Sequence, residues 1–572
     1  MEKRALQLAS VASMIDQFNI PNIQILQSLG YKVDVVADFT HPGTITAERA
    51  EDLKKRLADM NVRVFDIPIP RSLNPKAIFF AYKQVKELLD KENYTLLHCH
   101  SPIGGVIARQ AAKGRNGLKV IYTAHGFHFY DGAPLKNWLI FYPIEKYYSR
   151  YTDVLITINK EDYKRASEKF HAKKTVYILG VGVDTEKFKP RENGRERIRT
   201  ELGLKDDQIL LLSVGELNEN KNHVSVIKAI QGLKLVYVIV GKGEKKDELE
   251  RVAKEQGDDV RLVGFRSDVA DFYDAADMYI LPSIREGLNV SLMEAMASSL
   301  PCLAGRIRGN VDLIDEKGGY LFDPVNVEEI RTSVEKCIEN RVGMGEHNLQ
   351  KIRNFDLTTV HNLTSEIYRG RGGYEHLVEV LKRQEKRREI GVPINAFLLM
   401  SVGELNENKN HSVILKAIAN IERKDIHYAI AGKGKLEESL KALAEELGIG
   451  DRVHILGFHS DIPELYHASD VCVFPSIREG LGLAAVEGMA SGLPLIVSDN
   501  RGTRSFVSSE NGVVCKYDDA DGFAVAIMKL YKSETCQKKL GDHNSIECKK
   551  YDLKEVKMQM KDIYANANNI PM

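Results

Sequence analysis

The sequence has little that would place it outside the cell or inside a membrane. Its 572 residues include seven cysteines, an odd number without a Cys-x-x-Cys pair. Such cysteines are typical of the reduced thiols of a cytosolic protein. No run of about 18 apolar residues occurs, so we expect no membrane-spanning helix. The apolar start, Ala5 to Met14, is short and predicts a first strand and no signal peptide.

A net charge is also lacking, because 80 Lys and Arg residues balance 80 Asp and Glu residues. The charge is unevenly spread, since the stretch through residue 190 holds 28 basic and 20 acidic residues. This basic surplus would suit an acidic surface or an acidic ligand, or it is ordinary scatter of surface charge. No basic module with interleaved aromatic residues is present, so nothing indicates nucleic-acid binding.

The most informative feature that is present is an internal repeat. Ser213–His223 and Ser401–His411 both read SVGELNENKNH, and Pro282–Leu288 and Pro475–Leu481 both read PSIREGL. Identity of this length indicates a duplicated unit, with copies of roughly 175 residues, the size of one domain. The first 190 residues have no second copy.

The repeat predicts three globular domains, each large enough to bury its own core. Their predicted ranges are 1–190, 191–370 and 375–572. The polar stretch Arg191–Arg197 is expected to be a linker, and Arg369–Gly373 is expected to separate the two copies. Glu375–Arg388 is predicted to be a charged helix that leads into the second copy.

Apolar runs alternate with helical patterns along the chain, which favours α/β domains with parallel sheets. The predicted strands are Tyr31–Ala37, Thr95–His98, Val120–Thr123, Val154–Ile158, Ile209–Val214, Leu235–Val240, Val260–Val263 and Met278–Leu281.

Two carboxylates eight positions apart, Glu286 and Glu294, mark a candidate ligand site. The first follows a predicted strand, and the second is one to two turns into a predicted helix that runs through Ala297. Loops at the carboxyl ends of parallel strands bind ligands, and the amides near Leu288–Val290 would lie at a helix N-terminus. Free amides and the helix dipole favour an anion there, and a pyrophosphate would fit.

Lys221, in a loop after another strand, would supply the cation that a diphosphate needs, and the carboxylates would accept hydrogen bonds from hydroxyls of a sugar and a ribose. The second copy repeats the set with Lys409, Glu479 and Glu487. It has Gly482 in place of Asn289, which would let the backbone approach a phosphate. A purely structural alternative makes Glu286 a turn residue and Glu294 a surface residue, although the apolar neighbours of Glu294 argue against it.

The segment PSIREGLNVSLMEAMASSLP resembles the donor-site signature of family 4 (group 1) glycosyltransferases, retaining enzymes of the GT-B fold. The stretches ASMIDQFNIPNIQILQSLGY, HCHSPIGG, TAHGFHFYDGAPLKNWLIFYPIEKYYSRYTDVLITIN and GVGVDTEKF resemble the acceptor domain of the exopolysaccharide and capsule subgroup. The resemblance covers nearly the whole chain. It implies an acceptor-side Rossmann-like domain, a nucleotide-sugar-binding Rossmann-like domain, and here a second copy of the latter.

The resemblance also implies roles for individual residues. Glu286 would contact donor sugar hydroxyls, Glu294 the ribose and Lys221 the diphosphate. The main chain near Phe265 would meet the base, and His125 would line the sugar site in the cleft. The implied catalytic residues are Glu286 and His125. The implied donor-binding residues are Lys221, Phe265, Glu286, Leu288, Asn289, Val290 and Glu294, with second-copy equivalents Lys409, Phe458, Glu479, Leu481, Gly482 and Glu487.

The sequence departs from the family at one position. Many members have an arginine, paired with the lysine, where this chain has Glu216 and, in the second copy, Glu404. Phosphate neutralisation would then depend on Lys221, with Arg285 or a residue of the first domain as helpers. The family implies no cofactor and no metal. His98-Cys99-His100 supplies only two alternating ligands, and Gly241–Gly243 is a weak partial nucleotide loop that is more often a turn.

One stretch is strongly aromatic. Residues 136–150 contain the single Trp138 together with Phe141, Tyr142 and flanking basic residues. They would form either a buried helix against the first sheet or a patch at a membrane interface that meets a lipid-linked acceptor. The second alternative would place a cytoplasmic protein peripherally on the inner face of the membrane.

The expected function is transfer of a hexosyl or N-acetylhexosaminyl unit from a nucleotide diphosphate sugar to a glycan, with retention of configuration. The expected acceptor is polyprenyl-linked, in exopolysaccharide or capsule biosynthesis. The alternatives are a nucleotide-sugar epimerase of the same fold and, for the second copy, a non-catalytic binding or regulatory module.

Overall fold

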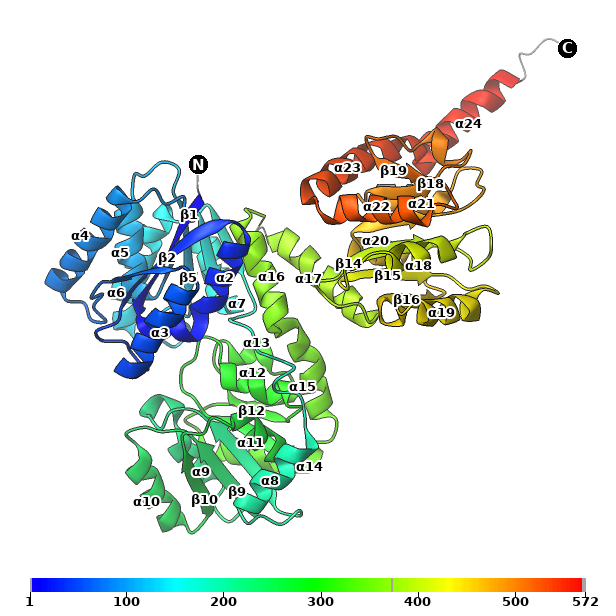
Figure 1. Ribbon diagram of the computed structural model, residues 1–572. Coiled ribbons are helices and arrows are strands. Elements are labelled where there is room, and N and C mark those ends of the chain that lie inside the picture. The colour runs from blue at the N-terminus through cyan, green and yellow to red at the C-terminus, as the bar shows by residue number, and fades with distance from the viewer. Residues whose placement is uncertain (1–2, 372–373, 568–572) are drawn as a thin grey trace. The chain divides into compact units, whose positions relative to one another are not determined.

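The computed structural model describes residues 3–371 and 374–567, which contain three sheets of parallel strands (Figure 1). The chain forms two compact units, Met1–Val378 and Glu379–Met572. The first unit holds two of the sheets and the second unit holds the third. The predicted α/β class is therefore confirmed. Among the described residues, no helix combines the length and apolar character that crossing a bilayer requires.

The first sheet has seven strands in the order β3-β2-β1-β4-β5-β6-β7. Its strands are β1 (Lys3–Val11), β2 (Tyr31–Asp38), β3 (Arg63–Asp66), β4 (Leu96–His100), β5 (Lys119–Ala124), β6 (Val154–Thr157) and β7 (Lys174–Tyr177). The helices are α1 (Ala12–Met14), α2 (Ile20–Ser28), α3 (Ala47–Asp59), α4 (Pro75–Lys91), α5 (Pro102–Ala112), α6 (Leu135–Tyr148) and α7 (Lys160–Lys169).

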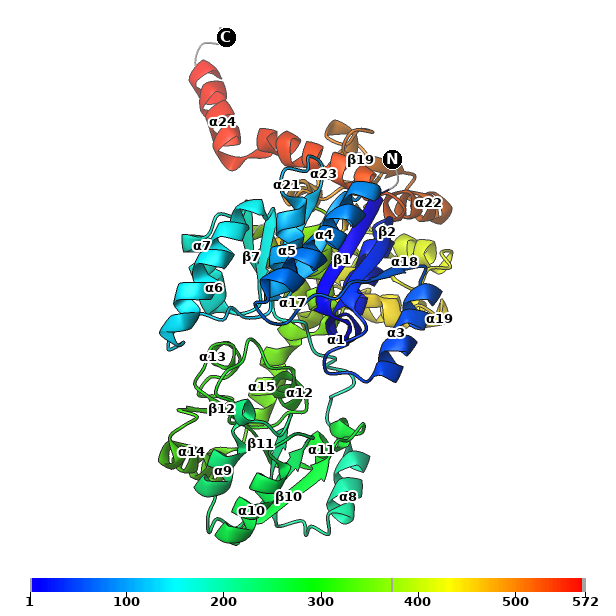
Figure 2. The same ribbon diagram turned by 90° about the vertical axis from the view of Figure 1, so that its left-hand side faces the viewer.

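The two faces of this sheet differ in character. Leu97 and Cys99 of β4 belong to the apolar core that α4, α5 and α6 cover, and Figure 2 shows α4 and α5 in front of the sheet. Because side chains alternate along a strand, His98 and His100 point to the opposite face. There they form hydrogen bonds with polar side chains, so this face of the sheet is polar.

The second sheet follows in the first unit, in the order β10-β9-β8-β11-β12-β13. Its strands are β8 (Ile209–Val214), β9 (Leu235–Val240), β10 (Asp259–Gly264), β11 (Met278–Leu281), β12 (Cys302–Gly305) and β13 (Gly319–Phe322). The helices are α8 (Glu192–Glu201), α9 (His223–Ala229), α10 (Lys246–Gln256), α11 (Val269–Ala275), α12 (Val290–Ala297), α13 (Asn310–Leu313), α14 (Val327–Asn340), α15 (Met344–Ile352) and α16 (Leu357–Tyr368).

The third sheet has the equivalent order, β16-β15-β14-β17-β18-β19. Its strands are β14 (Phe397–Val402), β15 (Ile426–Ala431), β16 (Val453–Gly457), β17 (Val471–Phe474), β18 (Leu495–Ser498) and β19 (Gly512–Cys515). The helices are α17 (Tyr374–Glu389), α18 (His411–Ala419), α19 (Glu437–Glu446), α20 (Ile462–Ala468), α21 (Leu483–Ala490), α22 (Ala520–Tyr531), α23 (Glu534–Glu547) and α24 (Leu553–Ala567). In this order, connections run in opposite directions from the first strand, and ligands bind at that switch point.

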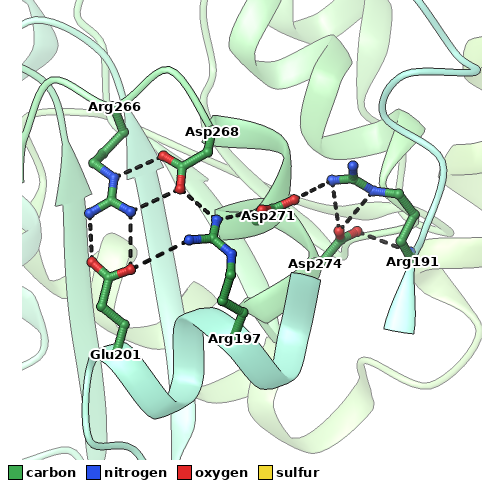
Figure 3. A network of polar contacts seen from close by, with 7 residues as sticks. All are labelled: Arg191, Arg197, Glu201, Arg266, Asp268, Asp271 and Asp274. Carbon is green, nitrogen blue, oxygen red and sulfur yellow. Dashed lines mark hydrogen bonds and ion pairs between the residues drawn. The ribbon is translucent and has the colours of Figure 1, made fainter. Parts of the chain in front are cut away.

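The predicted linker Arg191–Arg197 is wrong, because Glu192–Glu201 forms helix α8. Charged side chains on α8 and just before it form ion pairs with charged residues on and beside α11, as Figure 3 shows. Arg191 contacts Asp274 at 3.0 Å, and Arg266 contacts Glu201 at 2.5 Å. A stretch that is polar in sequence is therefore ordered by its ion pairs. The network comprises Arg191, Arg197, Glu201, Arg266, Asp268, Asp271 and Asp274.

Helix α17 is the second copy of α8, and the predicted helix at Glu375–Arg388 is confirmed. Equivalent arginines of the two helices bind equivalent aspartates: Arg195 and Arg199 contact Asp277, and Arg383 and Arg387 contact Asp470. The repeated structure therefore extends upstream of the identical strings. Of the predicted break at Arg369–Gly373, residues 372 and 373 lie outside the described residues.

The other strand predictions agree with the structure to within a few residues, except at the start. The predicted strand Ala5–Met14 ends early, because β1 stops at Val11 and Ala12–Met14 form the helical turn α1. A short apolar run does not distinguish a strand from a buried helical turn.

Two chain segments connect the first and second sheets, and they meet each other. Val183, after β7, pairs in parallel with Asp356, just before α16. Its amide donates to the Phe355 carbonyl at 2.9 Å, and its carbonyl accepts from the Leu357 amide at 3.0 Å. Helix α16 then returns to the first sheet and packs against α2.

Candidate active site

The candidate site lies at the switch point of the second sheet. Lys221 ends a short 3₁₀ turn (Glu219–Lys221) after β8, and Glu286 lies in the loop after β11. The Lys221 Nζ is 2.7 Å from the Glu286 Oε1, and both side chains are mostly buried. The two predicted residues are therefore brought together, although 65 positions separate them in the sequence. A bound diphosphate would compete with the carboxylate for this ammonium group.

The start of α12 supplies backbone donors beside this pair. Asn289 is the N-cap, and its Oδ1 accepts a hydrogen bond from the Leu292 amide at 3.2 Å. Leu288 precedes the cap and Val290 is the first helical residue. The amides of residues 288–290 thus lie at a helix N-terminus, where unpaired N–H groups and the helix dipole favour an anion.

Glu294 lies one turn further along α12. Its Oε2 accepts a hydrogen bond from the Tyr273 hydroxyl at 2.9 Å. Burial raises the pKa of Glu294 to about 7, and the Tyr273 hydrogen bond opposes the rise. The carboxyl group is therefore poised between its neutral and charged forms near neutral pH.

His125, after β5, begins a buried chain of hydrogen bonds on the polar face of the first sheet. The His125 Nε2 lies 3.2 Å from the His100 Nδ1, and the His100 Nε2 lies 3.1 Å from the Gln7 Oε1. Gln7 and His98 both contact the Tyr368 hydroxyl, at 3.1 and 2.7 Å. Burial lowers the pKa of His125 to about 4, so its imidazole is neutral at pH 7. It can exchange hydrogen bonds with a hydroxyl but carries no charge.

The same contacts account for His98 and His100, which had been considered as metal ligands. Their ring nitrogens meet Thr123, Tyr368, Gln7 and His125. Within residues 3–371 and 374–567, no three His, Cys, Asp or Glu side chains are arranged to hold a metal ion.

The first and second sheets meet directly beside Glu286. A Cβ on Gly287 would lie 2.1 Å from the His125 carbonyl oxygen, and a Cβ on Gly180 would lie 2.3 Å from the Leu288 Cδ2. At Gly287 only glycine permits the approach, because a side chain would overlap the opposing backbone, whereas at Gly180 the φ of +74° favours glycine. The contact places His125 next to the loop that carries Glu286.

Arg308 also connects the domain of the second sheet to that of the first sheet, and the sequence analysis did not predict it. Its Nη1 is 2.9 Å from the Asp162 Oδ1, and its Nε donates to the Glu286 carbonyl at 3.2 Å. The guanidinium also lies over the Tyr130 ring, 4.8 Å from its centre. Both charged groups are buried. Arg308 lies in the loop after β12, outside the recognised motif, so no sequence signal distinguished it.

Three other predicted positions are peripheral to this pair. Phe265 follows β10 and is 67% exposed, with the Lys242 Nζ 5.5 Å from its ring centre. Glu216 accepts a hydrogen bond from Asn218 at 2.8 Å. Gly241 forms a turn whose Cβ position would overlap the Gly215 carbonyl.

The second copy reproduces the central pair, with the Lys409 Nζ 2.6 Å from the Glu479 Oε1. The residues around this pair differ from those of the first copy. Glu487 is exposed, and Tyr466 donates to the Ala484 carbonyl. Gly482 has a φ of +89°, and a Cβ there would lie 2.8 Å from the Phe474 ring, so local conformation by itself requires glycine.

Most of the other predicted positions of the second copy are exposed to solvent. Phe458 is exposed and Leu481 is partly buried. Gly480, equivalent to Gly287, has nothing within 4 Å of its Cβ position, and the side chain of Arg501, equivalent to Arg308, is exposed.

Comparisons with known proteins show which family the chain belongs to. The family described as Glycosyl transferases group 1 matches residues 194–354 and again 382–545, and Glycosyltransferase Family 4 matches residues 23–187. The chain belongs to the group 1 glycosyl transferases. EpsD of Bacillus subtilis (strain 168) is 37% identical over 334 residues, which cover 56% of this chain and 84% of EpsD.

Another relative of this glycosyltransferase is the UDP-Gal:alpha-D-GlcNAc-diphosphoundecaprenol alpha-1,3-galactosyltransferase of Escherichia coli. It is 25% identical over 354 residues, which cover 59% of this chain and 88% of the relative. Among solved structures, Anabaena Alr3699/HepE in complex with UDP superposes with a TM-score of 0.53 at 18% identity, over 64% of this chain and all of that one. The structural likeness shows the GT-B fold over the matched part, and the third parallel sheet forms an additional Rossmann-like domain.

The Arg308–Asp162 pair should hold the two halves of the glycosyltransferase together. Arg308→Ala leaves a buried carboxylate without its cation, so we expect it to lower the free energy of unfolding of the first unit by about 3 kcal/mol or more. Arg501→Ala is the matched control, and its exposed side chain should change stability by less than about 0.5 kcal/mol. Urea unfolding followed by protease susceptibility measures both; equal effects would contradict the assigned role.

The raised pKa of Glu294 makes stability depend on pH. The folded protein holds the Glu294 proton more tightly than the unfolded chain, so stability should fall as pH rises from about 4.5 to 7. Glu294→Gln cannot titrate. The melting temperature of the wild type relative to this variant should therefore decrease between pH 5 and pH 8 without ligand. The same comparison for Glu487→Gln should change less, and a pH-independent difference for Glu294 would refute the assignment.

Proposed function

We propose that this glycosyltransferase moves a hexosyl or N-acetylhexosaminyl unit from a nucleotide diphosphate sugar to a polyprenyl-linked glycan, with retention, in exopolysaccharide or capsule synthesis. The observation that carries the proposal is the Lys221–Glu286 pair beside the N-terminus of α12, facing His125. A cation, free amides and a carboxylate stand together where a sugar diphosphate needs them.

In the proposed mechanism the donor diphosphate lies at the start of α12 and takes Lys221 as its counter-ion. Glu286 then exchanges the ammonium for hydroxyls of the donor sugar, and Glu294 binds the ribose. As the bond between the sugar and the diphosphate breaks, Lys221 and the amides stabilise the developing charge. This neutralisation requires no bound metal. Neutral His125 hydrogen-bonds the sugar from the opposite wall of the cleft.

The donor site has one cation fewer than the family pattern, since Glu216 replaces the arginine. Catalysis in this proposal follows from positioning and leaving-group stabilisation, without a protein nucleophile. Retention is proposed from the family resemblance alone.

The lipid-linked acceptor is supported by helix α6 and by the name of the E. coli relative, which acts on a diphosphoundecaprenol-linked sugar. Leu135 and Leu139 lie one turn apart on α6 and are 72% and 69% exposed. Trp138 and Phe141 pack against the core of the first sheet. The helix thus has features of both predicted alternatives: a partly buried aromatic face, and an exposed apolar face that would lie in a membrane surface at the cytoplasmic side.

We further propose three functional domains, residues 1–190, 191–370 and 375–572, with the middle one as the working donor domain. Its Gly287 and Arg308 contact the acceptor-side domain, whereas equivalent Gly480 and Arg501 are open within the second unit. The second copy is then a binding or regulatory module. A nucleotide-sugar epimerase remains the alternative within enzymes, and it would form product without an acceptor.

The duplicated motif allows a matched test. Glu286→Ala removes the carboxylate that would hold the donor sugar, so we expect kcat/KM for transfer to fall by about 100-fold or more. Glu479→Ala should retain most of the wild-type rate. Initial rates with the nucleotide sugar that most stabilises the wild type to heat measure both. A reversed outcome would make the second copy the donor domain, and wild-type rates for both variants would refute the donor site.

A further inference from the structure

A cavity of about 240 Å³ opens beside Glu286, on the side of the first sheet. Its wall carries six charged residues: Asp131, Glu161, Arg285, Glu286, Arg306 and Arg308. Ile284, Ile307 and Val311 add apolar surface. The cavity therefore borders the carboxylate proposed for the donor sugar but is separate from the start of α12.

Five of the six charges already have partners. Asp131 and Glu161 both bind Arg165, at 2.6 and 2.8 Å. Glu286 binds Lys221, Arg306 binds Glu329 at 3.1 Å, and Arg308 binds Asp162. In the part of the chain that the structure describes, the exposed Arg285 guanidinium makes no hydrogen bond or ion pair. Arg285 is therefore the charged group of this cavity wall that is available to an anionic ligand.

Arg285 shares the cavity wall with Tyr130 and Asp131 of the first domain. Burial lowers the pKa of His128, and the positive charges of Arg285 and Arg308 lower it further. The His128 ring in turn lies 4.6 Å from the ring of Phe141 on α6. Neighbouring groups thus lead from Glu286 to Arg285, from Arg285 to His128, and from His128 to α6, the helix that carries Leu135 and Leu139.

We infer that Arg285 binds the diphosphate of a prenyl-linked acceptor, with its sugar in the cavity beside Glu286 and its lipid along α6. The inference rests on the proposed function and names the chemical group that the site recognises. The order carboxylate, cation and exposed apolar helix matches the order sugar, diphosphate and lipid along such a molecule. An arginine fork suits the planar, bidentate recognition of phosphate oxygens.

The inference differs from a donor role for Arg285, which its sequence position next to Glu286 had suggested. The cation proposed for the donor is Lys221, which contacts Glu286 from the 3₁₀ turn after β8. Arg285 contributes only its backbone carbonyl in that direction, as acceptor from Asn220 at 3.0 Å. The two cations therefore serve two different anions in this assignment.

Binding of farnesyl diphosphate to the full chain tests the inference by calorimetry. Loss of a charge-assisted hydrogen bond should weaken the Kd of Arg285→Ala at least about tenfold. Arg285→Lys, which keeps the charge without the fork, should fall between it and the wild type. Arg478→Ala changes the equivalent exposed arginine of the second copy and should leave the Kd within about twofold.

Farnesol and inorganic pyrophosphate distinguish the sources of affinity, and both should bind more weakly than farnesyl diphosphate. Lys221→Ala separates the two anion sites, because it should weaken the nucleotide sugar and spare farnesyl diphosphate. The inference is overturned if the wild type does not bind farnesyl diphosphate, if Arg285→Ala binds it normally, or if Arg285→Ala weakens the nucleotide sugar instead. Failure of every nucleotide sugar to bind the wild type would refute the proposed function, whereas the farnesyl diphosphate series would still report on Arg285.

Discussion

The close approach of two backbones at Gly287 is the constraint on which the site depends. His125 and Glu286 belong to different sheets, and they face each other only because the His125 carbonyl reaches the Gly287 Cα without a side chain between them. Arg308 and Asp162 then provide a buried charge pair at the same junction. The close backbone approach and the buried ion pair thus lie at the same junction, and the side chains of the candidate site lie around it.

The local parts of this architecture could be predicted from the sequence. Apolar runs predicted the strands, and the carboxylate spacing predicted that Glu294 lies on a helix whose start holds residues 288–290. These predictions succeed because periodicity and helix starts are decided by neighbouring residues.

What the sequence did not reveal depends on partners far along the chain. Arg191–Arg197 looked like a linker because the carboxylates that order it come from residues some 70 to 80 positions later. The Arg308–Asp162 pair spans 146 positions. The series of hydrogen-bonded side chains that leads from His125 to Tyr368 draws on β1, β4, the end of β5 and α16. No window of sequence contains such contacts, and duplication offered no help because Arg501 repeats the residue without repeating its partner.

The paired crossing at Val183 and Asp356 has a mechanical consequence. Both segments that join the first and second sheets are tied to each other by two backbone hydrogen bonds at this one place. This crossing would therefore act as a hinge between the domains that hold the first and second sheets, and the cleft would open on the side away from it. Rotation about the crossing can widen or narrow the gap between His125 and Glu286 while every sheet stays intact. Such a rotation would break the glycine contact and the Arg308 pair, but no secondary structure.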